Sequence, residues 1–359
     1  MQPTIDRSPL SVKTSTMTSH RIIDRISPLW LGVGISGSLL LLMFLIESVT
    51  GRWAGLFVDG EFDPLARVEE GMLRDIRIAI VHCLVVGYLP AALLHAMRSG
   101  RRTVLELQKV LACTPMECEA LAKSVRLSTR SLVIIGLAAL VMGLSTPYLV
   151  PPIPEAPWNP ATWSPEVAWA RILGPVSMIL GWWLGYAILS VSVRLSRIAK
   201  TLATIDLLDI SPLAPFTQLG LTNALLLIGS LSIWSLMMVE TGFGQLMLII
   251  SGVTLVGTSL ALLVPVYGVH QRILQSKKQS LEWVNSELVS EQATFLAPQA
   301  GQESGRMSDL IAYRSMVESV PEWPFTLSTY TRAALYVLIP IATWGVGLIA
   351  EEILGSFFN

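Results

Sequence analysis

Long apolar runs dominate the chain and alternate with shorter polar stretches. Seven of these runs approach or exceed the ~20 apolar residues that a helix needs to cross a membrane. They lie near 29–48, 77–97, 131–150, 171–193, 217–239, 245–269 and 333–350. The pattern predicts an all-α fold, a polytopic membrane helix bundle of about seven transmembrane helices that occupies 29–350.

The sixth run continues as a helix beyond its apolar part. Ile273, Leu281, Val284 and Leu288 follow it at near-helical spacing, which predicts an amphipathic cytoplasmic extension. An apolar stripe outside the membrane needs a cover, either a neighbouring cytoplasmic helix or another subunit. These four residues are therefore candidate subunit contacts.

The stretches between the spans predict further organisation. Spans five and six are joined only by 240–244, which forces an antiparallel hairpin. Segments 98–130 and 270–331 are predicted to be cytoplasmic and largely helical. Within the second of them, 296–308 contains Pro, Gly and Ser and is typical of a flexible loop.

Lys and Arg are distributed unevenly between the two sides of this bundle. Stretches 1–28, 98–130, 194–216 and 270–331 together hold nineteen of these residues, and the stretches on the opposite side hold three. Because positively charged loops stay in the cytoplasm, the N-terminus is predicted inside, the C-terminus outside and the number of spans odd. Residues 1–28 are polar and rich in Ser and Thr, so we expect a disordered cytoplasmic tail. The expected location is the cell's inner (plasma) membrane.

Composition agrees with a membrane protein. Hydrophobic residues make up 52% of the 359 residues, charged residues make up 14%, and the mean hydropathy is +0.59. A soluble fold could not bury that much apolar surface, whereas lipid solvates it. The formal net charge of −1 provides no basic field for nucleic acid. The expected partners are membrane lipids and further copies of the chain in a homo-oligomer, with any small-molecule or ion ligand unknown.

Motifs that carry chemistry are missing from the sequence. It has no GxSxG, phosphate-loop or HExxH motif, so we expect no enzymatic activity, no catalytic residue and no cofactor. Cys113 and Cys118 form a Cys-x4-Cys pair, but no second pair of ligands accompanies them. We therefore expect no metal site and two reduced cysteines on a helix.

Hydroxyl and amide side chains mark one face of spans five and six. Ser251, Thr254 and Thr258 share one face of the sixth span, and Asn223 and Ser230 lie two turns apart on the fifth. Hydroxyls and carbonyls can line a pore, so these five residues are a candidate pore stripe. Small hydroxylated residues are also enriched where membrane helices pack, and packing is the open alternative.

Two other features of the spans allow more than one interpretation. Arg77 and His82 lie near the outer edge of the second span. An ionisable residue in the membrane suggests function, but a side chain this close to the interface can also reach the headgroups. Gly181 and Gly185 in the fourth span have the spacing typical of close helix packing.

Proline and tryptophan flank the membrane on both sides. The external stretch 147–170 is rich in both and is predicted to be a rigid cap on the headgroups or a platform for a ligand or partner. Residues 321–325 read Pro-Glu-Trp-Pro-Phe, a sequence that cannot form a regular helix. We expect a bend at the cytoplasmic interface there, with Trp323 and Phe325 as interfacial anchors.

Four stretches of the C-terminal part carry a resemblance to known proteins. They are Pro265 to Ile273, Asp309 to Arg314, Glu322 to Phe325 and Arg332 to Pro340. These stretches resemble the C-terminal part of an uncharacterised family of prokaryotic multi-pass membrane proteins, which implies a membrane fold and no particular activity. In topology alone, the predicted seven spans are similar to insect chemoreceptor-type ion channels, whose C-terminal signature is absent here.

Three functions fit these patterns. An oligomeric ion channel or channel-like protein is the leading hypothesis, because the bundle is uncharged, carries a hydroxyl stripe and extends into a helix suited to subunit contacts. A transporter of an uncharged or amphiphilic solute would require a cavity within one chain. A non-transporting accessory or sensory subunit would require neither a pore nor a cavity.

Overall fold

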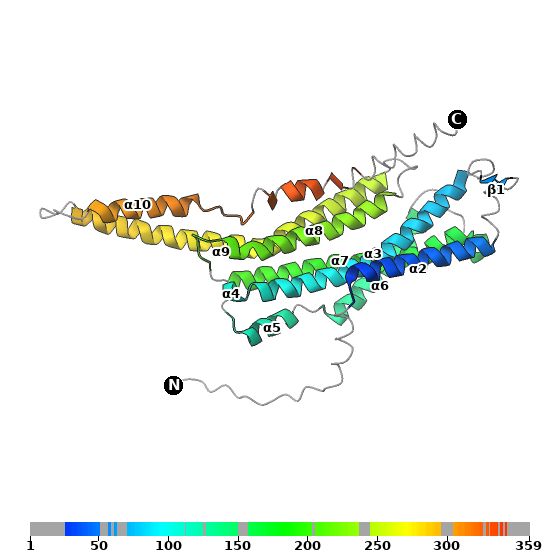
Figure 1. Cartoon of the computed structure of the whole chain (residues 1–359), viewed down its shortest axis with the longest axis horizontal. Coiled ribbons are helices and arrows are strands. Elements are labelled where there is room, and N and C mark those ends of the chain that lie inside the picture. Colours follow the sequence, from blue (N-terminus) through cyan, green and yellow to red (C-terminus); the bar gives the residue numbers. More distant parts are fainter. Residues whose placement is uncertain are drawn as a thin grey trace, which may run out of the picture.

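The computed structural model is built almost entirely from long helices (Figure 1). It describes residues 26–50, 57–58, 61–62, 70–111, 113–124, 127–149, 157–202, 205–236, 245–295 and 304–325, with short helical stretches between 328 and 342. The predictions for the tail before residue 26 and for the link 240–244 lie outside the described residues.

Six helices in the described part of the chain are long and apolar enough to cross a membrane. They are α2 (Pro28–Val49), α3 (Glu70–Glu106), α6 (Thr129–Leu149), α7 (Pro165–Leu202), α8 (Ala214–Ser235) and α9 (Gln245–Phe295). Each contains one of the first six apolar runs, so the predicted multi-pass helical architecture is confirmed for them. The seventh run lies mostly outside the described residues, and both the count of seven and the orientation stay predictions.

Shorter elements complete the structure. They are β1 (Phe57–Val58), β2 (Glu61–Phe62), α4 (Gln108–Leu111), α5 (Pro115–Ser124), η3 (Pro160–Thr162), η4 (Ser211–Leu213) and α10 (Ser304–Ser319). β1 and β2 form an antiparallel pair in which Phe57 is opposite Phe62. This small hairpin leaves the architecture all-helical.

α3, α7, α8 and α9 form the centre of the bundle. α3 packs on α7 and α8, α9 packs on the same two helices, α2 lies against α3, and α6 lies against α7. Val85 and Leu89 of α3 are buried with Leu184 and Ile188 of α7 in one apolar core. The outer faces of α2, α6 and α9 expose large apolar residues such as Leu41, Ile134 and Val253. Lipid is a suitable solvent for such faces, so the six helices fit an integral membrane protein.

α8 and α9 run antiparallel, as the short link between them requires. Gly220 of α8 lies beside Leu262 of α9, and Leu227, further along α8, lies beside Gly257, which is earlier in α9. A Cβ added at Gly220 would stand 2.6 Å from the Leu262 carbonyl oxygen. The absence of a side chain at Gly220 therefore sets how closely the two helices approach.

α9 extends well past the bundle, and α10 folds back along it (Figure 1). We call residues 274–295 together with α10 the arm. Arg306 of α10 forms ion pairs of 2.9 Å with Glu287 and Glu291 of α9. The predicted helical extension of the sixth span is confirmed. α10 begins at Ser304, inside the segment 296–308 that the sequence predicts as a loop, so that prediction is wrong from Ser304 onward.

The arm is fixed to the bundle by a second apolar core. Leu107 directly after α3, Leu195 of α7, Phe216 of α8, Ile273 of α9 and Val317 of α10 are all buried in this one cluster. It joins four long helices to α10. At Ile273, the apolar stripe of the extension is therefore covered by neighbouring helices of the same chain. A neighbouring helix was one of the two covers that the sequence left open.

Candidate functional site

The candidate pore residues lie on the inner side of the bundle where the structure describes them. Asn223 and Thr258 are buried, with 1% and 6% of their surface exposed. Ser230 and Thr254 are half-buried, and the side chain of Ser251 lies outside the described residues. On the same helix as Thr258, Val256 and Leu260 are 60% and 47% exposed. The polar stripe therefore faces protein, and the opposite face of α9 faces outward.

Asn223 connects α8 to α7. Its Nδ2 donates to Ser192 Oγ at 3.3 Å, and Ser192 is itself fully buried. Asn223 Oδ1 and Thr258 Oγ1 are also buried and have no hydrogen-bond partner among the described residues. Sequence reasoning missed Ser192, although its hydroxyl in an apolar run is the same kind of signal that singled out Thr258.

Small residues set the helix crossings, but not at the predicted pair. Among the described residues, nothing lies within 4 Å of a Cβ added at Gly185 of α7, and Gly181 meets only a leucine methyl at 3.9 Å. The close packing predicted for this pair is therefore wrong. The close approach on α7 comes six residues before the helix end, where the Ser196 backbone meets Gly268 of α9. A glycine motif shows only that a close approach is possible, because the partner helix decides where it occurs.

His82 is a buried side chain between three helices. Its Nδ1 donates to the Ile78 carbonyl oxygen at 2.7 Å, and its ring meets Trp234 of α8 edge-on at 5.5 Å. Gly174 of α7 lies on its other side, since a Cβ there would be 3.7 Å from His82 Nε2. Arg77, earlier in α3, is half-buried. His82 is therefore packed between helices, which contradicts the alternative that this side chain reaches the headgroups and leaves the functional alternative untested.

Sequence reasoning also missed a buried carboxylate. Glu47 stands near the end of α2 and is only 2% exposed. It is the sole acidic residue in the first apolar run, which was the available signal. Glutamate side chains are mostly exposed in proteins, whereas Glu47 is buried in the folded chain.

The predicted interfacial anchors Trp323 and Phe325 belong to a segment that is held against the bundle by ring stacking and hydrogen bonds. Trp323 stacks on His270 of α9, with centroids 4.0 Å apart and planes 7° from parallel, and Phe325 stacks on Trp323 at 5.7 Å. His270 Nδ1 donates to the Glu322 carbonyl oxygen at 2.9 Å, and Thr217 Oγ1 donates to the Pro324 carbonyl oxygen at 3.1 Å. The predicted non-helical segment is confirmed, and both anchors pack in this stack.

The candidate subunit contacts are covered in different degrees by their own chain. Ile273 and Val284 have no exposed surface, and Leu281 and Leu288 are half-buried. Trp283 and Tyr313 meet edge-on between α9 and α10 at 6.3 Å. A single chain thus already covers most of the stripe, and a subunit contact at these four residues stays a prediction.

Cys113 and Cys118 are paired in a disulfide, with Cα atoms 5.8 Å apart. The expectation of two reduced cysteines is therefore corrected. The start of α5 explains the pairing: Glu117 Oε2 accepts from the Thr114 amide at 2.9 Å, and Thr114 Oγ1 accepts from the Glu117 amide at 3.3 Å. In such a capping box the residue before the cap and the fourth residue of the helix face each other, and these positions are Cys113 and Cys118.

The proline- and tryptophan-rich stretch that the sequence predicts to be external folds back onto α6. Trp158 Nε1 donates to the Leu144 carbonyl oxygen at 3.1 Å, and Trp163 Nε1 donates to the Pro157 carbonyl oxygen at 3.1 Å. The two rings meet edge-on at 6.1 Å. These contacts agree with a rigid cap, and residues 150–156 of this stretch lie outside the described residues.

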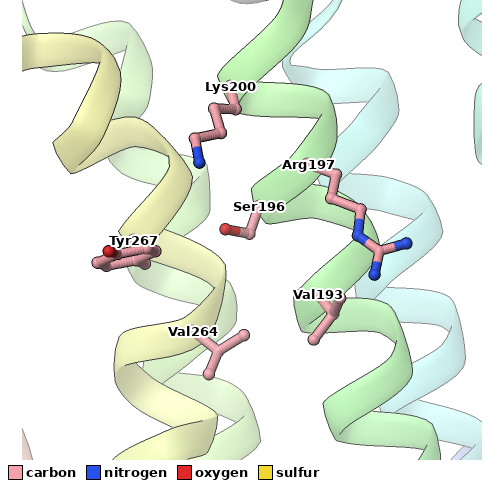
Figure 2. A pocket seen from close by; sticks show the side chains of 6 residues that line it. All are labelled: Val193, Ser196, Arg197, Lys200, Val264 and Tyr267. Atoms are coloured by element: carbon pink, nitrogen blue, oxygen red, sulfur yellow. The ribbon is translucent and has the colours of Figure 1, made fainter. Parts of the chain in front are cut away.

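A cavity between α7 and α9 was not foreseen. It has a volume of about 250 Å³ and is lined by Val193, Ser196, Arg197, Lys200, Val264 and Tyr267 (Figure 2). The sequence indicated Arg197 and Lys200 only as cytoplasmic charges. Their neighbours from α9 are 64 to 70 residues further along the chain, and no local pattern connects them.

Comparison with known proteins does not assign the chain to a group. No family model, no curated protein and no solved structure matches it.

Proposed function

We propose that the protein is a channel-like membrane protein that passes a small polar or ionic species between α7, α8 and α9. One observation carries this proposal: Asn223 Oδ1 and Thr258 Oγ1 are buried in apolar helices without a hydrogen-bond partner among the described residues. An unsatisfied buried polar atom costs about 1–3 kcal/mol. Water or a passing ion would satisfy both atoms and remove that cost.

Helix packing explains the same residues less completely. Packing accounts for the burial of the stripe and for the Asn223–Ser192 hydrogen bond. Packing does not supply hydrogen-bond partners for Asn223 Oδ1 and Thr258 Oγ1, although buried polar groups in membrane proteins are normally satisfied. A hydrated path accounts for the burial, the hydrogen bond and the two atoms together.

Cysteine accessibility tests the hydrated path. Cys83, Cys113 and Cys118 are first replaced, and Thr254→Cys, Thr258→Cys and Ser192→Cys are then exposed to a small water-soluble thiol reagent. Reaction requires the thiolate, which forms poorly in lipid or in a dry core. We expect reaction at these positions and none at the controls Val256→Cys and Leu260→Cys, which lie on the outward face of α9. No reaction at any of the substituted positions would favour the helix-packing alternative.

Ion conduction separates the channel from its alternatives. Protein reconstituted in a planar bilayer should pass current, and Thr258→Trp should reduce it by filling the path. Reactive cysteines without current would favour the transporter of an uncharged or amphiphilic solute. Absence of both current and reactivity would remove the channel proposal.

Assembly into a homo-oligomer in the plasma membrane, with the arm in the cytoplasm, is part of this proposal. Outside the membrane the arm exposes Trp283, Val289, Ile311 and Met316, and a second copy is a suitable cover for apolar residues in water. Val289→Asp should therefore reduce the size of the detergent-solubilised particle. Ile273→Asp should instead unfold the chain, because that side chain is buried within it.

An accessory or sensory subunit is the second candidate. It is favoured by the continuity of α9, a single helix of 51 residues that runs from the bundle into the arm. A movement of its membrane part would be carried into the arm along this one helix, which contains Pro265 before the arm begins. Spin labels at Val289 and Ile311 that respond to the transmembrane potential in protein that passes no current would support this candidate.

A further inference from the structure

An open apolar groove runs along α6 near the end of that helix. The groove has a volume of about 410 Å³, and the described residues that line it are Val141, Leu144, Ser145, Tyr148 and Trp158. The Trp158 indole is fixed there, because its Nε1 donates to the Leu144 carbonyl oxygen at 3.1 Å. Val141 and Tyr148 are 68% and 51% exposed. The groove therefore opens away from the bundle, toward the surroundings of the protein.

Arg171 of α7 lies level with the Tyr148 end of this groove. α6 and α7 run antiparallel and approach closely where Gly143 meets Pro175, since a Cβ added at Gly143 would be 2.7 Å from Pro175 Cα. From that point, Tyr148 lies five residues on along α6 and Arg171 lies four residues back along α7. Arg171 interacts electrostatically with Tyr148, and its guanidinium carbon is 5.9 Å from the centroid of the Trp158 ring. The groove therefore has a cation at one end.

Arg171 has an aromatic neighbour but no anionic one in the part of the chain that the structure describes. It is half-buried, its Nε has no hydrogen-bond partner among these residues, and no described carboxylate interacts with it. Arg306 of the arm differs, because two glutamates pair with it at 2.9 Å. A charge that is partly removed from water is stabilised by an opposite charge within reach. Arg171 is therefore suited to bind an anionic group from outside the chain.

The groove lies at an edge of the apolar layer. Stretches 131–149 of α6 and 172–193 of α7 contain no charged residue, and Tyr148 and Arg171 stand at their ends. Tyr and Trp prefer the membrane interface, and an Arg at the end of an apolar helix reaches the headgroups. Arg171 therefore lies at the depth of lipid phosphates. Val141 precedes Tyr148 by seven residues, which places it about 10 Å deeper along the helix, among acyl chains.

We infer that this groove binds a glycerophospholipid, with the phosphate on Arg171 and an acyl chain along Val141 and Leu144 beside Trp158. Arg binds phosphate oxygens through several donors, and the phosphate supplies the anion that Arg171 lacks among the described residues. The apolar lining suits an acyl chain. A soluble phosphate would contact Arg171 but would leave that lining uncovered. The inference does not depend on the proposed path, which lies between α7, α8 and α9.

Lipid binding is tested on the full chain in maltoside micelles, titrated with a phosphatidylglycerol that carries a photoreactive diazirine in its acyl chain. Crosslinks are mapped by mass spectrometry, and the concentration that half-saturates labelling of 141–148 measures binding. Arg171→Gln should raise that concentration roughly fivefold, since one cation near a membrane contributes about 1 kcal/mol. The matched control is Arg130→Gln, at an exposed residue near the other end of α6, which should leave it unchanged. Equal values in the two variants would overturn the inference.

A second pair of variants tests the groove without removing charge. Ser145→Trp fills the groove and should reduce labelling of 141–148. Ile134→Trp, at a position on α6 that is 67% exposed and does not line the groove, should not. No difference between these two variants would overturn the acyl-chain contact.

Two further probes identify the headgroup. A diacylglycerol with the same diazirine lacks the phosphate, so it should require a roughly fivefold higher concentration than phosphatidylglycerol in the unmodified protein. Labelling by both lipids at the same concentration would overturn the phosphate contact. Loss of phosphatidylglycerol labelling in excess inorganic phosphate would overturn the lipid assignment in favour of a soluble ligand. None of these readouts depends on ion conduction.

Discussion

Gly268 of α9 lies directly against the backbone of Ser196 on α7. A Cβ added at Gly268 would overlap with the Ser196 carbonyl oxygen and stand 2.7 Å from its carbonyl carbon and 2.9 Å from its Cα. Contacts this short do not occur for real side chains, and the opposing atoms are backbone. Gly268 thus fixes the α7–α9 crossing, and Ser196 is also part of the cavity wall.

Gly268→Ala should destabilise the protein by about 1–3 kcal/mol, the usual cost of overpacking, because the two helices must separate to admit the methyl group. Gly252→Ala on the same helix is the control, since no described residue lies within 4 Å of its added Cβ. That control should be neutral or stabilising by up to about 1 kcal/mol. The midpoint of thermal unfolding in detergent measures both variants. A Gly268→Ala midpoint as high as that of the control would contradict the close crossing.

Trp323→Ala should release the segment 321–325 from α9. The stacked ring on His270 contributes about 0.5–1.5 kcal/mol beyond the burial of its area, and its loss leaves the segment held by the Thr217 and His270 hydrogen bonds. Backbone amide exchange should become severalfold faster at positions 322, 323 and 325, since residues 321 and 324 are prolines without an amide hydrogen. Trp30→Ala, at a side chain that is 71% exposed on α2, should leave this exchange unchanged. If Trp323→Ala also leaves it unchanged, the stack does not hold the segment.

The orientation is testable with three exposed positions. In a chain without its native cysteines, Arg102→Cys and Gln279→Cys should be labelled from the cytoplasmic side by an impermeant reagent, and Asn159→Cys from the external side. The reason is the excess of Lys and Arg in the segments around the first two positions. Labelling of all three positions from one side would contradict the predicted topology.

Acid should remove a contribution made by Asp209 before α8. The Ser211 hydroxyl and amide both donate to Asp209 Oδ1, at 2.6 and 3.0 Å, and these bonds hold the pKa of that carboxyl below its usual value. Because the folded pKa is lowered, the stabilisation is present above the unfolded pKa of about 3.9 and is lost as the pH falls through the folded pKa.

The thermal midpoint of Asp209→Ala should accordingly be lower than that of the unmodified protein at neutral pH, with the difference closing below about pH 4. Asp309→Ala, which removes an exposed carboxyl from α10, controls for the general effect of acid. A difference that stays constant down to the lowest pH would show that the carboxylate form of Asp209 is not what stabilises the turn.

The hydrophobic pattern alone determined the six long apolar helices and the continuation of α9 beyond the bundle. The apolar runs and the stripe from Ile273 to Leu288 are local patterns, and local patterns specify helices and their apolar faces. Proline chemistry likewise predicted the break at 321–325. The sequence could not state what covers Ile273, because a stripe does not identify the helix that packs on it.

Only the tertiary structure decided the relationships between distant parts of the chain. Gly268 and not Gly185 makes the tight crossing, since a glycine permits close approach only where a partner backbone arrives. Ser192 pairs with Asn223, and Lys200 shares a cavity with Tyr267, because α7, α8 and α9 meet in space. The sequence separates these partners by 31 and 67 residues, and packing, not spacing along the chain, brings their side chains together.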